Sequence, residues 1–189
     1  MVCHSGRFSL VLGVSLALTA AASGRILLEG GSLRLDISSD GLVQGVQASD
    51  TRTEYAWTAA PMPIAAVYRG GQMAVGSQES HGEFELPVYR GGQCFPASHV
   101  SLAGDRLTIQ FAGANVTATY EITRGLRYLA FQLLSLEGDP IDRIDLLQLR
   151  VRRLPCLGPW INVAYDDQFG ICLCGGNIQT TAGMRQEGE

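Results

Sequence analysis

The sequence predicts an all-β protein: an antiparallel β-sandwich of the large two-sheet type, with roughly ten or more strands. Three observations predict it. Apolar and polar residues alternate with period two over short segments, as in half-buried strands. Turn-forming Gly, Pro, Asp and Asn separate these segments at spacings of about 8–12 residues. The connections are mostly too short for the crossovers that parallel strands need, and no helical periodicity follows the N-terminal apolar run.

The clearest strand is 33–37, where Leu33, Leu35 and Ile37 alternate with polar residues. A Ser-Asp-Gly turn at 39–41 follows it. Further strands are expected at 42–48, 64–68, 83–89, 98–102, 107–111, 116–123, 128–136, 144–151, 161–165 and 171–174. The segment 70–82 has no strand pattern, and we expect a long irregular loop there.

The N-terminal segment 1–22 has the three parts of a secretory signal peptide. Arg7 supplies the positive charge, 8–22 form an apolar run, and Ala20 and Ala22 make a small-residue cleavage site. The run is short for a membrane span, which takes about 20 apolar residues. We therefore expect cleavage after Ala22, a secreted or periplasmic location without further membrane association, and one domain over 23–189. An uncleaved anchor and a buried N-terminal helix are the alternatives.

The charge balance argues against a nucleic-acid partner. All 14 basic residues are Arg, and they face 18 acidic residues. Without Arg7 the balance is 13 against 18, a net charge of −5. The densest basic spot is the Arg cluster within 150–153, which is interpreted as a solvated strand face. Too little positive charge is gathered in one place to neutralise a row of phosphates.

Four cysteines remain after cleavage: Cys94, Cys156, Cys172 and Cys174. An even count in an oxidising compartment permits two disulfides, with three connectivities. Cys172 and Cys174 are two apart in an expected strand, so they share a face and are expected to bond to other cysteines rather than to each other. The alternative is that the cysteines are buried thiols. Cys-x-Cys without further Cys or His nearby is a poor zinc site, and no metal is expected.

One internal repeat is present: Val-Tyr-Arg-Gly-Gly-Gln occurs at 67–72 and again at 88–93. Two copies do not define a solenoid. Each copy is expected at a strand end that enters a turn, where Gly-Gly allows positive φ. If the two turns lie side by side, the Tyr-Arg pairs at 68–69 and 89–90 form a patch suited to a sugar or a carboxylate.

No catalytic residue is expected in this chain. The P-loop, GxGxxG, HExxH and GxSxG motifs are absent. His81 and His99, the two His outside the signal, have no nucleophile in motif context. Asp166 and Asp167 are paired carboxylates of the kind that glycosidases use, but adjacent residues on a turn diverge, and turn formation explains them.

Two further groups are candidates for ligand binding. Glu137, Asp139, Asp142 and Asp145 supply oxygens that suit Ca²⁺, but without EF-hand spacing a solvated hairpin is favoured and no cofactor is expected. The second group surrounds an expected turn, where exposed rings can pack against the C–H face of a sugar; the alternative is that the rings are core. Its members are Trp160, Tyr165, Asp166, Asp167 and Phe169.

Three parts of the chain resemble the N-terminal, galactose-mutarotase-like β-sandwich that precedes the catalytic barrel in some large secreted glycoside hydrolases. The first part comprises 33–37, 40–43 and 50–55, and the others are 138–144 and 160–174. The resemblance implies a non-catalytic module whose partners are carbohydrate and a downstream catalytic domain that carries the catalytic carboxylates. It also implies that the chain is a fragment, truncated at its C-terminus, or a stand-alone copy of such a module.

Two alternatives to this function stay open. One is an independent secreted carbohydrate-binding or adhesion domain with a ligand surface near 165–169. The other is a small mutarotase-like or lyase-like enzyme, which requires His81 or His99 to meet a carboxylate in a pocket. The catalytic His and Glu contexts of the mutarotases cannot be matched to either His.

Overall fold

The computed structural model describes residues 24–48, 50–56, 61–75, 87–158 and 162–176. These residues form thirteen strands and one short 3-10 helix, so the expectation of an all-β antiparallel sandwich is confirmed. The segment expected to be a signal peptide, 1–22, lies outside the described residues. Within the described ranges, no helix is long and apolar enough to cross a membrane.

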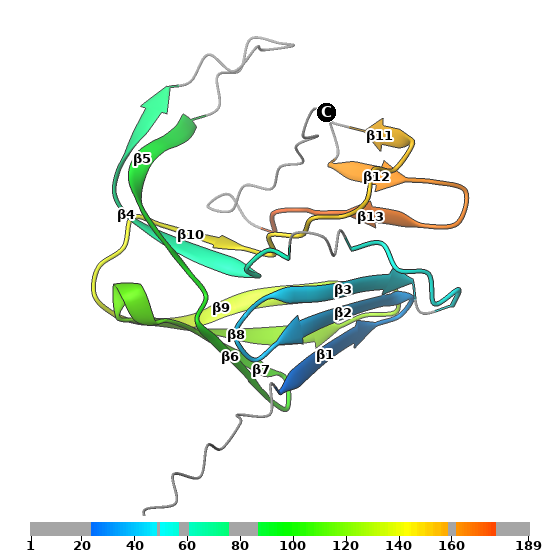
Figure 1. The fold of residues 1–189 in the computed structure, drawn as a ribbon, viewed down its shortest axis with the longest axis horizontal. Helices are drawn as coiled ribbons and strands as arrows, with labels where there is room; N and C mark the ends of the chain where they lie inside the picture. Colours follow the sequence, from blue (N-terminus) through cyan, green and yellow to red (C-terminus); the bar gives the residue numbers. More distant parts are fainter. Residues whose placement is uncertain (1–23, 49, 57–60, 76–86, 159–161, 177–189) are drawn as a thin grey trace, which may run out of the picture.

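The strands are arranged in four antiparallel sheets, and two of these make the sandwich (Figure 1). The first sheet of the sandwich contains β1 (Arg25–Gly30), β2 (Leu33–Ser38) and β3 (Val43–Ala48). The second contains, in spatial order, β6 (His99–Ala103), β7 (Arg106–Phe111), β8 (Val116–Arg124) and β9 (Leu129–Gly138). The 3-10 helix η1 (Ala112–Ala114) joins β7 to β8.

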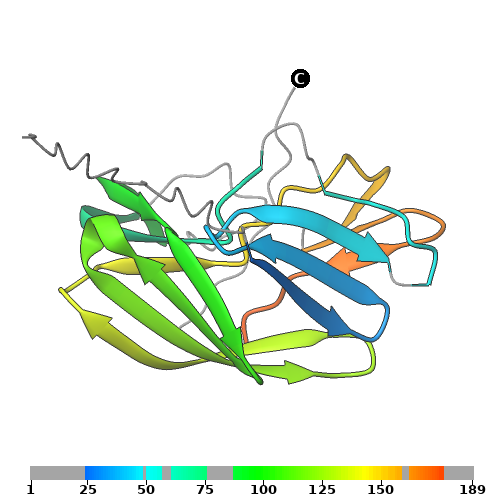
Figure 2. The same cartoon turned by 60° about the horizontal axis from the view of Figure 1, so that its bottom comes forward.

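Two smaller sheets flank the sandwich (Figures 1 and 2). One has β4 (Ala65–Val75) between β10 (Arg143–Leu146) and β5 (Pro87–Pro96). The other has β12 (Val163–Tyr165) between β11 (Cys156–Gly158) and β13 (Gly170–Cys172).

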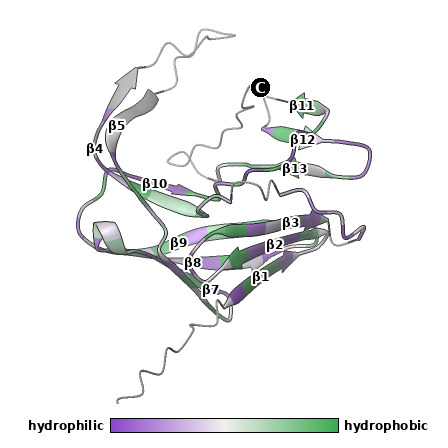
Figure 3. Cartoon of the chain, in the orientation of Figure 1, coloured by the Kyte–Doolittle hydropathy of each residue, from purple (hydrophilic) through white to green (hydrophobic). Residues whose placement is uncertain are grey.

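The core lies between the two sheets of the sandwich and follows from the period-two pattern. In β7, Leu107, Ile109 and Phe111 are fully buried while their polar neighbours face outward. Leu28 and Ile37 supply the opposite side from β1 and β2. Figure 3 shows the resulting alternation of hydrophobic and hydrophilic residues along these strands. The half-buried alternation expected of a sandwich strand is regular in β1, β7 and β8. It is less regular in β2, where Asp36 is buried as well, and in β9.

The observed strands differ from the expected elements at several points. β1 and β11 were not anticipated. The strand expected at 144–151 is shorter, because Leu147 adopts a positive φ of 59° that ends the extended conformation of β10. The expected loop at 70–82 is wrong in its first part, because β4 continues to Val75.

The strand expected at 83–89 is displaced, since β5 begins at Pro87 and runs to Pro96. The two copies of the hexapeptide repeat explain both shifts, because they pair with each other. In the β4–β5 ribbon Arg69 lies opposite Gln93, Gly71 opposite Gly91, and Gln72 opposite Arg90. Position three of one copy therefore pairs with position six of the other, which gives the ribbon a local twofold relation.

Positive φ at the repeat glycines was expected and is found, but inside a ribbon rather than in two turns. Gly70, Gly91 and Gly92 have φ of 76°, 73° and 85°. Glycine adopts these angles without steric cost, so the ribbon can bend where the two copies pair. The first residues of β4 are buried in the core, and beyond the glycines the ribbon curves away from the sandwich (Figure 1).

Candidate functional site

The turn between β12 and β13 is held by Asp166. Its Oδ1 accepts hydrogen bonds from the backbone N–H groups of Gln168 and Phe169 at 2.8 and 2.7 Å. The backbone N–H of Asp166 donates to the carbonyl of Phe169 at 2.9 Å. This is the turn chemistry expected of an Asp at this position. Oδ1 of the Asp166 carboxylate is thus already used in hydrogen bonds to the backbone.

A three-layer stack fixes this turn to the sandwich. The ring of Phe169 lies 4.1 Å from the ring of Tyr55 with an interplanar angle of 20°. The guanidinium of Arg152 lies over the Tyr55 ring at 4.2 Å and is 3.6 Å from Asp166 Oδ2. The backbone N–H of Arg152 also donates to the Tyr55 carbonyl at 2.7 Å. Stacked rings and a cation over a ring are both favourable, so the stack is an anchor for the small sheet.

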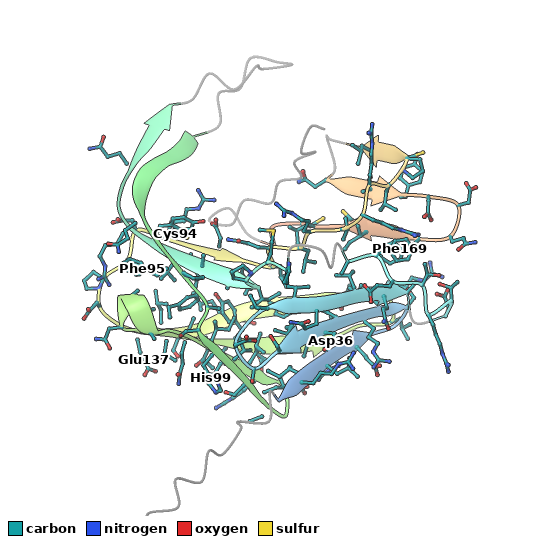
Figure 4. All side chains as sticks on the ribbon, viewed as in Figure 1. Asp36, Cys94, Phe95, His99, Glu137 and Phe169 are labelled. Atoms are coloured by element: carbon teal, nitrogen blue, oxygen red, sulfur yellow. The ribbon has the colours of Figure 1, made fainter. Side chains whose placement is uncertain are left out.

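The five residues proposed as a carbohydrate surface therefore do not form one exposed surface in the described structure. Phe169 is buried beneath the turn (Figure 4), so its ring offers no face to a ligand. Asp166 is half-buried within the turn, whereas Tyr165 is 46% exposed and Asp167 is exposed. Trp160 lies outside the described residues. The described surface of the turn is thus one open ring and one open carboxylate on a backbone fixed from below.

All four cysteines of the predicted mature part are described, and none forms a disulfide. Contrary to expectation, the sulfurs of Cys172 and Cys174 lie close together, with 3.3 Å between the two Sγ atoms. β13 ends at Cys172, so the extended geometry that would separate the two side chains does not continue to Cys174. The hydrogen bond with Cys174, followed by burial, raises the pKa of Cys172. Cys94 is exposed and Cys156 is half-buried.

Three carboxylates of the acidic stretch considered for Ca²⁺ have separate partners. Asp139 lies 3.9 Å from Arg69, and Asp142 accepts a hydrogen bond from the backbone N–H of Gly70 at 2.6 Å. Asp145 pairs with Arg143 at 2.5 and 2.9 Å. Within the described ranges, no three His, Cys, Asp or Glu side chains gather closely enough to hold a metal ion.

An open hollow of about 530 Å³ lies where the β4–β5 ribbon meets the loop before β10. Arg69 crosses it, donating to the carbonyls of Pro140 and Ala114 at 2.8 and 2.9 Å. Arg69 takes no part in the expected patch of two Tyr-Arg pairs, because its side chain ties the ribbon to the sandwich. The side chains of the second pair, at 89–90, lie outside the described part of the structure. The guanidinium of Arg143, not that of Arg69, lies over the Tyr68 ring at 5.3 Å.

Sequence reasoning missed a carboxylate cluster around Gly45. Asp36 is buried, accepts a hydrogen bond from Arg25 at 2.5 Å, and has a second oxygen without a hydrogen-bond partner among the described residues. A Cβ on Gly45 would lie 3.0 Å from Glu54 and 3.3 Å from Asp36, so the glycine makes room for both. Glu54 accepts from the backbone N–H groups of Val46 and Ala56 at 2.8 Å each. These bonds tie the segment around Glu54 to β3, and period-two patterning gave no signal for them.

The enzyme alternative needs a His beside a carboxylate. His99 lies exposed on β6 (Figure 4). It pairs with Gln110 of β7 and makes no ion pair with a described carboxylate. His81 lies outside the described residues. Compared with models of protein families, with curated proteins and with solved structures, the chain matches none of them.

Proposed function

We propose that the chain is a non-catalytic β-sandwich module of a secreted carbohydrate-active protein, similar to the galactose-mutarotase-like sandwich that accompanies a catalytic barrel in glycoside hydrolases. Its role is to present the turn after β12 to a glycan. The observation that carries the proposal is the exposure of two residues of this turn, Tyr165 at 46% and Asp167 two positions further along the chain.

The chemistry of these two groups suits a sugar. An aromatic ring is apolar on its face and packs against the C–H groups of a pyranose. A carboxylate accepts charge-assisted hydrogen bonds from hydroxyl groups. The turn is held by Asp166 and by the buried stack of Phe169 on Tyr55, so little ordering is required on binding.

The same chemistry supports a non-catalytic role. Glycoside hydrolysis uses two carboxyl groups that flank the bond to be broken. Asp166 is occupied by backbone N–H groups and by Arg152, which leaves Asp167 as the open carboxylate of this turn. An independent secreted binding or adhesion domain would use this same surface, and only its dependence on a neighbouring catalytic domain differs.

A glycan array followed by calorimetry tests the proposal. The chain should bind at least one glycan, and Tyr165→Ala and Asp167→Asn should each weaken that binding about tenfold or more. Tyr128→Ala is the matched control, because Tyr128 is 56% exposed but lies at the β8–β9 turn. Glycan binding that survives Tyr165→Ala, or a chain that binds no glycan, would overturn the proposal. Hydrolysis of the bound glycan by the chain alone would overturn its non-catalytic part.

A further inference from the structure

The end of β13 places two thiols where they can react with each other. The Sγ atoms of Cys172 and Cys174 are 3.3 Å apart, and a covalent S–S bond is about 2 Å long. An approach of roughly 1.3 Å would therefore close the bond. The backbone N–H of Leu173 donates to the Asn162 carbonyl at 3.2 Å, so the residue between the cysteines is held by the neighbouring chain.

The pair is also accessible. Both cysteines are exposed, whereas a structural disulfide is protected when its sulfurs are buried. Exposed disulfides have more oxidising potentials than buried ones, which makes them labile and able to exchange with other thiols. A bond between these cysteines closes only a short loop, so it contributes little to the stability of the fold.

We propose that Cys172 and Cys174 form a reversible thiol–disulfide pair that exchanges with low-molecular-weight disulfides. In the first step, one thiolate attacks a sulfur of the disulfide RS–SR, the S–S bond breaks, and RS⁻ leaves and takes up a proton. In the second step, the other thiolate attacks the protein sulfur of the mixed disulfide and displaces the second RS⁻. Two protein thiols are oxidised and one external disulfide is reduced to two thiols, so electrons and protons balance.

The chain allows a clean experiment, because trypsin cuts after Arg. Cys94 falls in the peptide 91–106, while Cys156, Cys172 and Cys174 fall in the peptide 154–185. In a Cys156→Ser chain, the second peptide thus holds this pair alone. The reduced chain is incubated with oxidised glutathione, quenched with acid, alkylated with N-ethylmaleimide and digested.

The expected result is a peptide 154–185 that has lost two hydrogens, carries no alkyl group, and regains both thiols with reduced glutathione. Two equivalents of glutathione should be released for each Cys172–Cys174 pair that closes. Adding Cys172→Ser or Cys174→Ser should stop the second step and leave a glutathione adduct on the remaining cysteine. Cys94, in its own peptide, serves as the internal control for an exposed thiol outside the pair.

Two results would overturn the proposal. One is a Cys156→Ser chain in which both thiols stay open to alkylation at every ratio of oxidised to reduced glutathione. The other is an oxidised wild-type chain in which Cys172 or Cys174 is linked to Cys94 or Cys156. Either result leaves the glycan proposal unaffected, because glycan binding is measured through Tyr165 and Asp167.

Discussion

Tyr55 is held by its ring and not by its hydroxyl group. The ring is fully buried between Phe169 and Arg152, and the hydroxyl has no hydrogen-bond partner among the described residues. A buried polar group without a partner costs about 1–3 kcal/mol, so this residue stabilises the protein by stacking and lowers its stability through the hydroxyl.

Tyr55→Phe should therefore leave the free energy of unfolding unchanged or raise it by about 1 kcal/mol. Phe169→Ala removes the ring below and should cost about 3–5 kcal/mol. Urea unfolding followed by circular dichroism measures both. A loss of more than about 1 kcal/mol in Tyr55→Phe would mean that the hydroxyl is satisfied in the folded protein.

Tyr68 makes the free energy of unfolding depend on pH in the alkaline range. Burial, with smaller contributions from Asp145 and Cys94, raises the pKa of Tyr68 from 10.0 to about 12. A phenol whose pKa is higher in the folded state than in the unfolded state keeps its proton longer when folded. Its contribution to stability is present below pH 10 and is lost as the pH rises toward 12.

Tyr68→Phe should thus flatten the decline in stability over this alkaline range relative to the wild type. Denaturant midpoints at a series of pH values measure the difference, and phenolate absorbance in the two proteins shows how many tyrosines have titrated at each pH. The same slope in both proteins would contradict the assignment to Tyr68. Cys94→Ser is the control for the neighbouring thiol.

For single residues, the sequence predicted well which residues form turns, but poorly which side chains contact each other across the fold. Asp166 forms the turn that its residue type indicates, because the bonds it makes are local. The stack of Phe169 on Tyr55 joins distant parts of the chain, so no local pattern indicates which ring is covered. The same holds for Cys172 and Cys174, since their approach depends on where β13 ends.

Among the elements, the β4–β5 ribbon depends on glycine in two different ways. Gly91 and Gly92 both have positive φ, but a Cβ on Gly91 would meet open space. A Cβ on Gly92 would lie 2.9 Å from the backbone N of Gly71 and 3.0 Å from the carbonyl oxygen of Arg69. Of these two glycines, Gly92 is therefore the one that lies too close to the paired strand for a Cβ to fit without a shift.

Gly91→Ala should cost about 1–2 kcal/mol, the strain of a side chain in the left-handed region. Gly92→Ala adds a clash with the paired strand and should cost about 1–3 kcal/mol more. Thermal unfolding of the two variants compares them directly. Equal losses of stability would show that the paired strand moves away from residue 92 at no cost in free energy.

The repeat was a correct signal for positive φ and a misleading one for topology. Its glycines were expected in turns because Gly-Gly most often interrupts a strand. Here each copy supplies the partner that the other needs, so pairing continues through the glycines to Val75 and Pro87. Strand length follows from a contact between copies, which neither copy shows alone.

At the level of the whole molecule, the sandwich is open along β9. Leu133 and Leu136 pair with Tyr120 and Ala118 of β8, which are buried, so the leucines face the same inner side. Yet each is 43% exposed. In the described part of the chain, β9 is the edge strand of its sheet, and the described residues packed opposite it cover its inner face only in part.

The double variant Leu133→Gln/Leu136→Gln should stay folded, losing about 1 kcal/mol for each partly buried leucine. It should also bind less of an apolar dye than the wild type does. Leu107→Gln is the contrasting variant, because Leu107 is fully buried and a polar side chain there should unfold much of the population. Unchanged dye binding in the double variant would show that β9 is covered in solution.

The overall class was predictable because the sandwich is built from consecutive hairpins with period-two strands. The side sheets were less so. Strands were expected at 161–165 and 171–174, where β12 and β13 lie, but β11 was missed because its three residues are too few for alternation to stand out. Their position depends on the stack around Tyr55, which is a tertiary contact.

The twofold pairing of the repeat has a consequence for folding. Each copy of Val-Tyr-Arg-Gly-Gly-Gln is complementary to any other copy, including its counterpart in a second molecule. Within one chain, the short tether keeps the effective concentration of the twin high and favours the hairpin. The hexapeptide itself carries no information that distinguishes the hairpin from an exchange of strands between molecules. The residues that flank the repeat make that choice: the buried Ala65 and Ala66 on one strand and the half-buried Phe95 on the other.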